Sequence, residues 1–296
     1  MTCKYVRPAT LDEAVASLRE AAGEATVFAG GVALGILMNE GLLKPSWIVD
    51  ISRLDALRQI AAASNGGLSI GAAVANAEVL ASPDVKRHSS LLHEMADEIA
   101  CERVRNRGTI GGNLCLADPQ GDPPVALLAL DAVLRVRGHT GARQIPITEF
   151  FEDLYKTALA PGELLEAIDV SAMPPNCGTA YGKYAARRAM DYSSTISAAA
   201  SVECDPASGA IIRARIGLGG VGPIPLRARA AEAVLNGKKL DHGVLKAASA
   251  AQAELLEPLT DTLYSADYKR HVAGVLMQRT LRKAYDRARQ TTKGAA

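Results

Sequence analysis

Two pairs of adjacent glycines, Gly30-Gly31 and Gly111-Gly112, constrain this chain more than any other feature of its sequence. Glycine has no Cβ, so two in a row allow the backbone to bend with φ above zero and to bring bare N–H groups together around an anion. An isolated pair is more often only a tight turn. Two such pairs in one chain favour a phosphate site, and we predict that both contribute to it.

The residues around each pair support this interpretation. A short apolar run at residues 26–28 precedes the first pair, and a helical pattern at residues 34–38 follows it. A strand, a glycine turn and a helix start together form an anion site. The second pair lies between Thr109-Ile110 and Asn113. The amide of Asn113 can contact a phosphate or stabilise the turn, and both roles remain open.

Asp122 follows the second glycine pair closely. A carboxylate just beyond a phosphate site can accept two hydrogen bonds from a ribose diol, as the acidic residue after a dinucleotide-binding fingerprint does. It can also cap the helix that begins with Pro123-Pro124. The two roles are compatible with each other.

The glycine pairs, their order and their surroundings resemble the FAD-binding medium subunit of the molybdenum hydroxylases, the family of xanthine dehydrogenase and carbon monoxide dehydrogenase. Residues 29–33 read Ala-Gly-Gly-Val-Ala, where the family has a loop of the type Ala-Gly-Gly-Thr-Asp. Residues 105–113 read Arg-Asn-Arg-Gly-Thr-Ile-Gly-Gly-Asn, as in the family, and Gly121-Asp122 takes the place of its Ser-Asp or Gly-Asp. The similarity extends from residues 5–14 to the final helix.

The resemblance implies an α+β fold. It consists of a two-part FAD-binding domain of the vanillyl-alcohol-oxidase (PCMH) type and a smaller α+β C-terminal domain with a three-stranded sheet and helices. The turn cluster at residues 173–176 marks the boundary. We expect the FAD-binding domain at residues 1–175, with subdomains at about 1–55 and 56–175, the C-terminal flavoprotein domain at 176–290 and a tail at 291–296.

Local patterns predict the elements of both domains. An amphipathic helix with Thr10 as N-cap and Glu13 in a capping box is expected over residues 10–22. A buried strand is expected over residues 47–51 and a hairpin over residues 60–70. Further helices are predicted from about residue 78 and over residues 88–100. In the C-terminal domain we expect strands over 179–186, 194–202 and 211–218, and helices over 227–235, 245–256 and 266–289.

The resemblance also implies which residues bind FAD. Tyr192 would lie against the isoalloxazine ring, Lys183 near its polar edge and Leu165 in an apolar stretch beside it. Without the resemblance, Tyr192 is equally well explained as a core residue and Lys183 as a surface cation. The expected cofactor-binding residues are Ala29, Gly30, Gly31, Val32, Ala33, Thr109, Ile110, Gly111, Gly112, Asn113, Asp122, Leu165, Lys183 and Tyr192. We expect no metal ligands and no catalytic acid, base or nucleophile in this chain.

Two places depart from the family pattern. Val32-Ala33 replaces the usual Thr-Asp pair, and Gly121 stands where many relatives have serine. Side-chain hydrogen bonds to phosphate are therefore lost at these places, whereas backbone contacts remain available. We expect FAD to bind more weakly than in typical members, or to bind stably only within the assembled enzyme.

Composition and motifs argue against several other classes of protein. The net charge of +1 is unlike that of a nucleic-acid-binding domain. No apolar run approaches the roughly 18–20 residues that a membrane span requires, and no signal-peptide pattern is present, so we expect a cytoplasmic protein. The five cysteines are scattered, without the spacing of an iron–sulfur or zinc site. The G-x-G-x-x-G match at residues 217–222 is followed by Pro223 and Pro225, not by the helix of a nicotinamide-binding site.

By resemblance, the chain is the FAD-carrying electron-transfer subunit of a molybdenum-containing hydroxylase or dehydrogenase. A large subunit would hold the molybdenum cofactor and select the substrate, and a small subunit would hold two [2Fe-2S] clusters. The flavin would pass their electrons to an external acceptor. The expected assembly is a heterotrimer or a dimer of heterotrimers. Two alternatives remain: a stand-alone FAD-dependent oxidoreductase with its own substrate pocket, and a cofactor-free scaffold that kept the fold.

Overall fold

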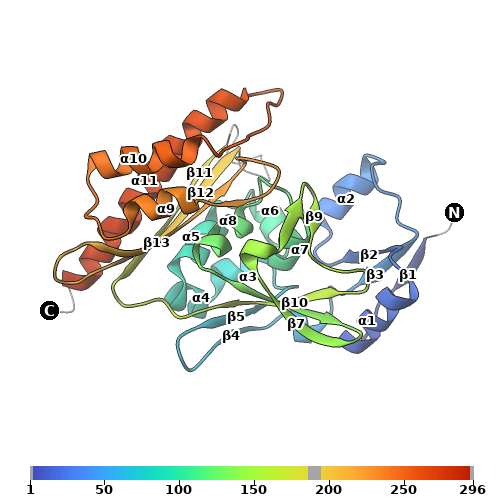
Figure 1. Cartoon of the computed structure of the whole chain (residues 1–296). Coiled ribbons are helices and arrows are strands. Elements are labelled where there is room, and N and C mark those ends of the chain that lie inside the picture. The colour runs from blue at the N-terminus through green and yellow to red at the C-terminus, as the bar shows by residue number, and fades with distance from the viewer. Residues whose placement is uncertain (1–2, 186–194, 294–296) are drawn as a thin grey trace.

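The computed structural model describes residues 3–185 and 195–293 (Figure 1). Within these ranges, helices are interspersed with the strands of three main sheets and one small hairpin. The α+β fold predicted from the sequence is therefore confirmed.

The first sheet is small and parallel, with β3 between β1 and β2. Helix α1 connects β1 to β2, and α2 connects β2 to β3. The predicted N-cap of α1 is confirmed, because the Thr10 hydroxyl accepts a hydrogen bond of 3.1 Å from the Glu13 backbone N–H. The elements are β1 Lys4–Val6, α1 Leu11–Glu20, β2 Ala25–Phe28, α2 Val32–Asn39 and β3 Trp47–Asp50.

The second sheet is antiparallel, with five strands in the order β4-β5-β10-β6-β7. The predicted hairpin is confirmed as β4 and β5, which pair Ile60 with Ile70. The strands are β4 Ile60–Ala62, β5 Leu68–Gly71, β6 Val133–Gly138, β7 Gly141–Pro146 and β10 Leu164–Val170. A small hairpin of β8 Phe151–Asp153 and β9 Lys156–Thr157 precedes β10.

Six helices occupy the chain between β5 and β6. The prediction of a helix over residues 88–100 after one near residue 78 was only partly right. Ser82 caps an additional helix by accepting a hydrogen bond from the Val85 N–H, and Pro83 fits the first helical position. All eight residues of α8 are buried. The helices are α3 Asn76–Ala81, α4 Pro83–His88, α5 Ser90–Glu98, α6 Glu102–Arg105, α7 Ile110–Leu116 and α8 Asp122–Ala129.

The third sheet is antiparallel and has four strands in the order β11-β12-β13-β14, not the three that were expected. Strand β14 has only two residues and follows Pro223 and Pro225, so it has no alternating pattern from which it could be predicted. Helices α9 and α11 cover one face of this sheet, and α5 and α8 cover the other (Figure 1). The elements are β11 Cys177–Tyr184, β12 Ile196–Cys204, β13 Ile211–Gly219, β14 Leu226–Arg227, α9 Arg229–Leu235, α10 His242–Ala253 and α11 Ala266–Lys293.

Residues 173–176 connect β10 to β11. The parts before and after them share a core, because Tyr181 and Ala199 of the third sheet belong to the same cluster of buried residues as α8. The domain division expected at residue 175 remains a prediction.

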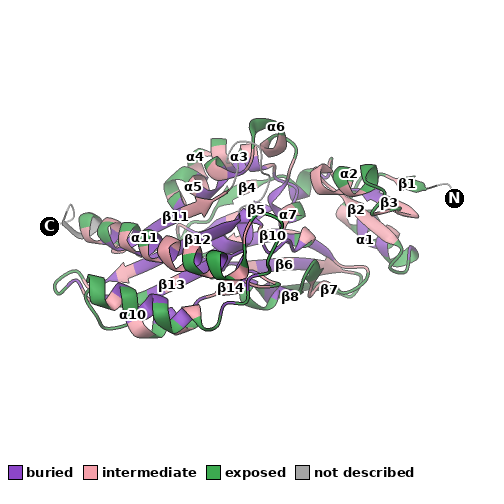
Figure 2. Ribbon diagram, turned by 90° about the horizontal axis from the view of Figure 1, so that it is seen from above, coloured by how far each residue is buried: buried purple, intermediate pink, exposed green. Residues whose placement is uncertain are grey.

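Helix α2 differs from the other helices in the way it packs. Its sequence, VALGILMN, is apolar along nearly its whole length, yet none of its residues is buried (Figure 2). Ile36 and Met38 are exposed, as is Leu42 just beyond the helix. Apolar surface of this kind marks a site of interaction with a partner or a ligand.

Glycine at position 178 is required by the packing of α11 on β11. A Cβ there would lie 2.2 Å from the carbonyl oxygen of Ala284 and 2.3 Å from the backbone nitrogen of Ala288. We predict that Gly178→Ala lowers the free energy of unfolding by about 1–3 kcal/mol, because α11 must move away from the sheet. Urea denaturation measures this change. Gly35→Ala is the matched control: a Cβ there meets nothing within 4 Å, so a gain of about 0.5–1 kcal/mol is expected. An unchanged unfolding midpoint for Gly178→Ala would contradict the packing.

Candidate functional site

A cavity of about 380 Å³ lies between α2, α7 and the start of β10. This volume falls within the range of about 300–1,000 Å³ that is typical of cofactor and small-molecule sites. Aliphatic side chains form most of its lining, and polar groups are few. The cavity brings together ten of the predicted residues: Ala29, Gly30, Gly31, Val32, Ala33, Thr109, Gly111, Gly112, Asn113 and Leu165.

The first glycine pair forms the N-terminus of α2. Gly31 is the N-cap residue, with φ of 74° and ψ of 7°, a left-handed conformation that favours glycine. No side chain caps this helix, and its first turn carries no acidic residue. Within the described ranges, the backbone N–H groups of residues 30–34 donate to no protein acceptor. Free N–H groups at the positive end of a helix dipole attract an anion.

Gly30 has a different reason to be glycine. A Cβ at this position would lie 1.8 Å from the carbonyl oxygen of Arg107 and 3.1 Å from the Cα of Gly108. The backbone of the first glycine loop therefore passes directly against the segment that leads into α7. This close approach joins the two sequence elements that were predicted to form one site.

The N–H groups of the second glycine pair have acceptors within the protein, and their predicted contact with phosphate stays a prediction. Residues 110–113 form the first turn of α7, and neither glycine has a positive φ. Their four N–H groups donate to Val74 O, Ala72 O, Thr109 Oγ1 and Thr109 O at 2.9–3.1 Å. The pair serves close packing instead, since a Cβ on Gly111 would lie 2.5 Å from the Cβ of Ala72. Ile110 is fully buried and does not line the cavity.

Two asparagine side chains line the cavity with hydrogen-bonding capacity left unused. The Oδ1 atoms of Asn76 and Asn113 are buried and accept no hydrogen bond from any described residue. Buried polar atoms are normally paired, so these two fit a site that is completed by a polar ligand. Asn113 was predicted from its place beside the glycines. Asn76 was missed because it reads as the start of an ordinary helix; the hydrogen bond from its N–H to Gly108 O, 2.9 Å long, brings it to the site.

Asp122 and Lys183 do not line the cavity, and their predicted contacts with the cofactor stay predictions. Lys183 Nζ donates to Asp122 Oδ2 at 2.7 Å, and both side chains are at most 2% exposed. The Tyr181 hydroxyl donates to Asp122 Oδ1 at 2.6 Å. Burial, and then the nearby carboxylate, raise the pKa of Tyr181 well above its usual value, so it remains a neutral donor.

This buried network joins α8 to β11. The Asp122 carboxylate is engaged with protein groups and does not line the cavity. It does not cap α8 either, because the N-cap residue is Gly121 and no side chain caps the helix. Lys183 is a buried partner of Asp122, neither a surface cation nor a residue of the cavity wall.

Of the two remaining predicted residues, Leu165 lies in the described part of the chain and Tyr192 lies outside it. Leu165 is 1% exposed and lines the cavity together with Leu164 and Glu163. The Glu163 carboxylate is held by two hydrogen bonds of 2.7 Å from Arg143, which lower its pKa. Tyr192 lies outside the described residues, so its contact with a flavin ring stays a prediction.

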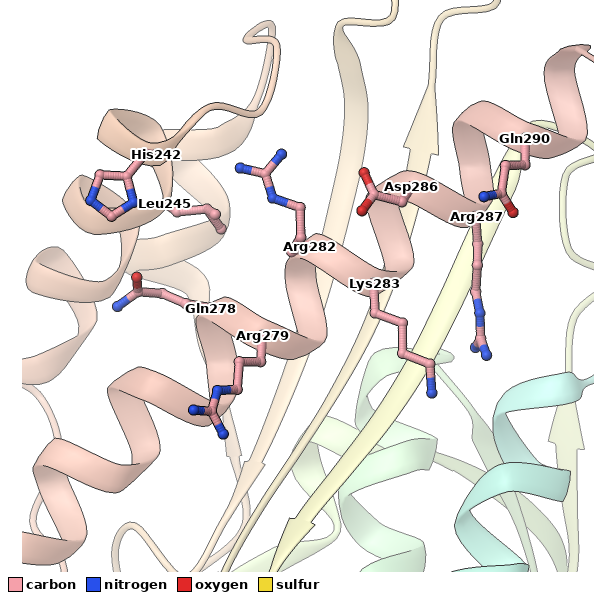
Figure 3. Close-up of a pocket in the computed structure, with 9 residues that line it drawn as sticks. All are labelled: His242, Leu245, Gln278, Arg279, Arg282, Lys283, Asp286, Arg287 and Gln290. Carbon is pink, nitrogen blue, oxygen red and sulfur yellow. The ribbon is translucent and has the colours of Figure 1, made fainter.

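A second and wider hollow, of about 630 Å³, lies on α11 (Figure 3). Its lining is mostly charged and comes from α11, with His242 and Leu245 added from α10. Arg287 donates to Thr179 O at 2.6 Å, and Lys283 pairs with Glu94 at 3.5 Å, so these cations attach the helix to its neighbours. None of the predicted binding residues in the described part of the chain lines this hollow. Despite its greater volume, it lacks the apolar walls of a cofactor site.

Two family models divide the chain between them. Residues 1–172 match the FAD binding domain in molybdopterin dehydrogenase, and residues 180–284 match the CO dehydrogenase flavoprotein C-terminal domain. The chain belongs to the FAD-binding subunits of the molybdopterin dehydrogenases. The resemblance found in the sequence is thereby confirmed, and the chain is an FAD-binding component of a molybdenum hydroxylase-type oxidoreductase.

Similar proteins support the same membership over the full length. The chain is 35% identical to the 6-hydroxypseudooxynicotine dehydrogenase complex subunit alpha of Paenarthrobacter nicotinovorans, over 97% of this chain and 96% of that protein. It is 33% identical to the carbon monoxide dehydrogenase medium chain of Hydrogenophaga pseudoflava, over 96% and 97%. A solved structure of the Hydrogenophaga pseudoflava enzyme, lacking the Mo-pyranopterin moiety of its cofactor, contains a chain that matches with a TM-score of 0.93 and 34% identity, covering 97% of this chain and 98% of that one.

The cavity fits FAD on chemical grounds. A pyrophosphate needs converging donors, which the first turn of α2 supplies, and the flavin and adenine rings need apolar walls, which α2, α7 and β10 supply. None of the described helices is both long enough and apolar enough to cross a membrane.

The buried network gives a direct test of where Asp122 acts. We predict that Asp122→Ala lowers the free energy of unfolding by about 3–5 kcal/mol, because it leaves the Lys183 ammonium buried without its anion. Urea denaturation measures the change, and the double variant Asp122→Leu with Lys183→Met should recover most of the lost stability. If Asp122→Ala is as stable as the wild type but binds FAD more weakly, the predicted role of Asp122 in binding the ribose would be supported instead.

Proposed function

We propose that this chain holds FAD in the cavity between α2 and α7 and passes electrons from the [2Fe-2S] clusters of a small partner subunit to an external acceptor. One observation carries the proposed placement of the cofactor. The N–H groups of residues 30–34 donate to no acceptor within the described chain, and all five residues line the cavity. The pyrophosphate supplies the acceptors that these donors lack.

Backbone donors also account for the two departures from the family sequence. Val32 and Ala33 have no hydrogen-bonding side chain, but each keeps an N–H in the first turn of α2. An anion at a helix N-terminus needs only such N–H groups and the helix dipole. Loss of the Thr-Asp side chains therefore weakens the contact with the cofactor without abolishing it.

The apolar part of the cavity suits the rings of the cofactor. Ile99, Leu159 and Leu165 contribute to its lining. Dispersion contacts with aliphatic side chains hold a flavin ring and keep water away from it. Bound FAD supplies the redox chemistry, since it takes up single electrons and releases them in pairs.

The chain's own side chains position and insulate the cofactor and transfer no proton. Glu163 is the acidic residue among those that line the cavity, so it is the one to consider for proton transfer. Arg143 holds its carboxylate in a bidentate pair, and the lowered pKa keeps it ionised near neutral pH. It is therefore a poor general acid.

The exposed face of α2 supports the proposed assembly. Most of its residues line the cavity, and Ile36, which also lines it, and Met38 are exposed to solvent. A partner that delivers electrons must approach the cofactor closely, and apolar surface beside the cavity favours such a contact. We infer a heterotrimer with a large molybdenum-cofactor subunit and a small [2Fe-2S] subunit, which can pair into a dimer of heterotrimers.

Substrate selection belongs to the large subunit in this proposal. The two named relatives belong to enzymes for carbon monoxide and for 6-hydroxypseudooxynicotine, two dissimilar molecules. This chain matches both over nearly its full length at similar identity. Such similarity is expected when the medium subunit handles electrons and another subunit binds the substrate.

Anaerobic titration separates the subunit from a stand-alone oxidoreductase. We predict that substrate bleaches the flavin absorption only when this chain is purified together with both partners, because the electrons must come through the clusters. The isolated chain is expected to lose FAD readily, since one wall of its cavity is uncovered. Flavin that is bleached by a substrate in the isolated, FAD-reconstituted chain would overturn the subunit proposal in favour of a free-standing enzyme. Absence of flavin from the intact complex would leave a cofactor-free scaffold.

A further inference from the structure

Asn76 has the features expected of a ligand-binding residue. It is the first residue of α3, it is only 3% exposed and it lines the cavity. Its Oδ1 atom is buried without a hydrogen-bond partner. The backbone N–H, by contrast, donates to Gly108 O at 2.9 Å. An unpaired buried amide lowers the stability of a fold, so its presence needs another explanation.

Helix capping does not provide that explanation. The start of α3 is stabilised by Glu78, whose carboxylate accepts a hydrogen bond of 2.8 Å from the Ala75 N–H. The Asn76 side chain takes no part in this arrangement. An apolar residue of similar size would fill the same space without burying a polar group.

The position of Asn76 points to the part of the ligand that it meets. A Cβ on Gly108 would lie 3.3 Å from Asn76 Nδ2 and 3.7 Å from Val32 Cγ2. The bare Gly108 thus brings the amide close to the first turn of α2, where the unpaired N–H groups lie. Rotation of the amide exchanges its oxygen and nitrogen positions, so the side chain can present an N–H to an anion.

We propose that Asn76 is a further cofactor-binding residue, whose amide donates a hydrogen bond to a pyrophosphate oxygen of FAD. This inference rests on the proposed placement of FAD in the cavity. It supplies a side-chain donor to an anion site in which Val32 and Ala33 offer only backbone groups. In the cofactor-free chain the amide is unpaired, and in the loaded chain it is paired.

Two opposite effects follow from a single substitution. Asn76→Leu removes an unpaired polar group, so the deflavinated protein should unfold at a temperature equal to or above that of the wild type. The same substitution removes a hydrogen bond to a charged group, so the dissociation constant of FAD should rise about tenfold to a hundredfold. A residue with a purely structural role would not give a stable protein with weakened binding.

The test uses the complex of this chain with its partners, deflavinated and titrated with FAD while flavin fluorescence is followed. Asn76→Leu and Asn76→Asp are compared with the wild type. Asp at this position would place a carboxylate against the pyrophosphate, so it should weaken binding more than Leu does. Asn65→Asp is the matched control, because it adds the same charge in the exposed turn between β4 and β5, away from the cavity lining, and its carboxylate can still accept the hydrogen bond from the Gly67 N–H. It should bind FAD as the wild type does.

The possible outcomes are distinct. Wild-type affinity in Asn76→Leu would overturn the role of Asn76 and leave the placement of FAD intact. Affinity in Asn76→Asp equal to or above that of the wild type would also overturn it, since a carboxylate is tolerated beside a ribose hydroxyl but not beside a phosphate. A wild-type complex that takes up no FAD would overturn the proposed function itself.

Discussion

The site depends on the close approach of Gly30 to the carbonyl oxygen of Arg107, where any side chain would force two backbones apart. This contact sets the loop after β2 against the segment that enters α7. It fixes the N-terminus of α2 over the cavity, and it places Asn76, which is hydrogen bonded to Gly108, beside the same helix end. Because Gly30 has no Cβ, groups from three separate parts of the chain can lie together at the site.

The two walls of the cavity differ in how firmly the protein holds them. In α7, the N–H groups of the first turn are all satisfied within the protein, and Gly111 packs directly on Ala72. In α2, no residue is buried and the first N–H groups donate to no described residue. Elements with few buried contacts are the ones that open most easily. The cofactor and a partner subunit would complete the wall that this chain leaves unfinished, which explains why such a chain functions as a subunit.

Sequence patterns predicted the α+β fold, most helices and strands and the first glycine loop, because these depend on local spacing and on one left-handed glycine. They did not predict the close packing of Gly111 on Ala72, because Ala72 lies far away in the sequence. They also did not predict that Asp122 binds Tyr181 and Lys183, because these two residues belong to a strand distant in the sequence. Asn76 gave no signal at all, because only its burial in the folded chain makes its amide unusual.

Amide hydrogen exchange of the deflavinated complex, measured residue by residue before and after FAD is added, tests the central claim most directly. Residues 30–34 should exchange rapidly without the cofactor and become protected when it binds, because their N–H groups then acquire acceptors. Residues 110–113 should be protected in both states, because their acceptors belong to the protein. Protection gained at residues 110–113, with residues 30–34 unchanged, would contradict the account and return the pyrophosphate to the second glycine pair.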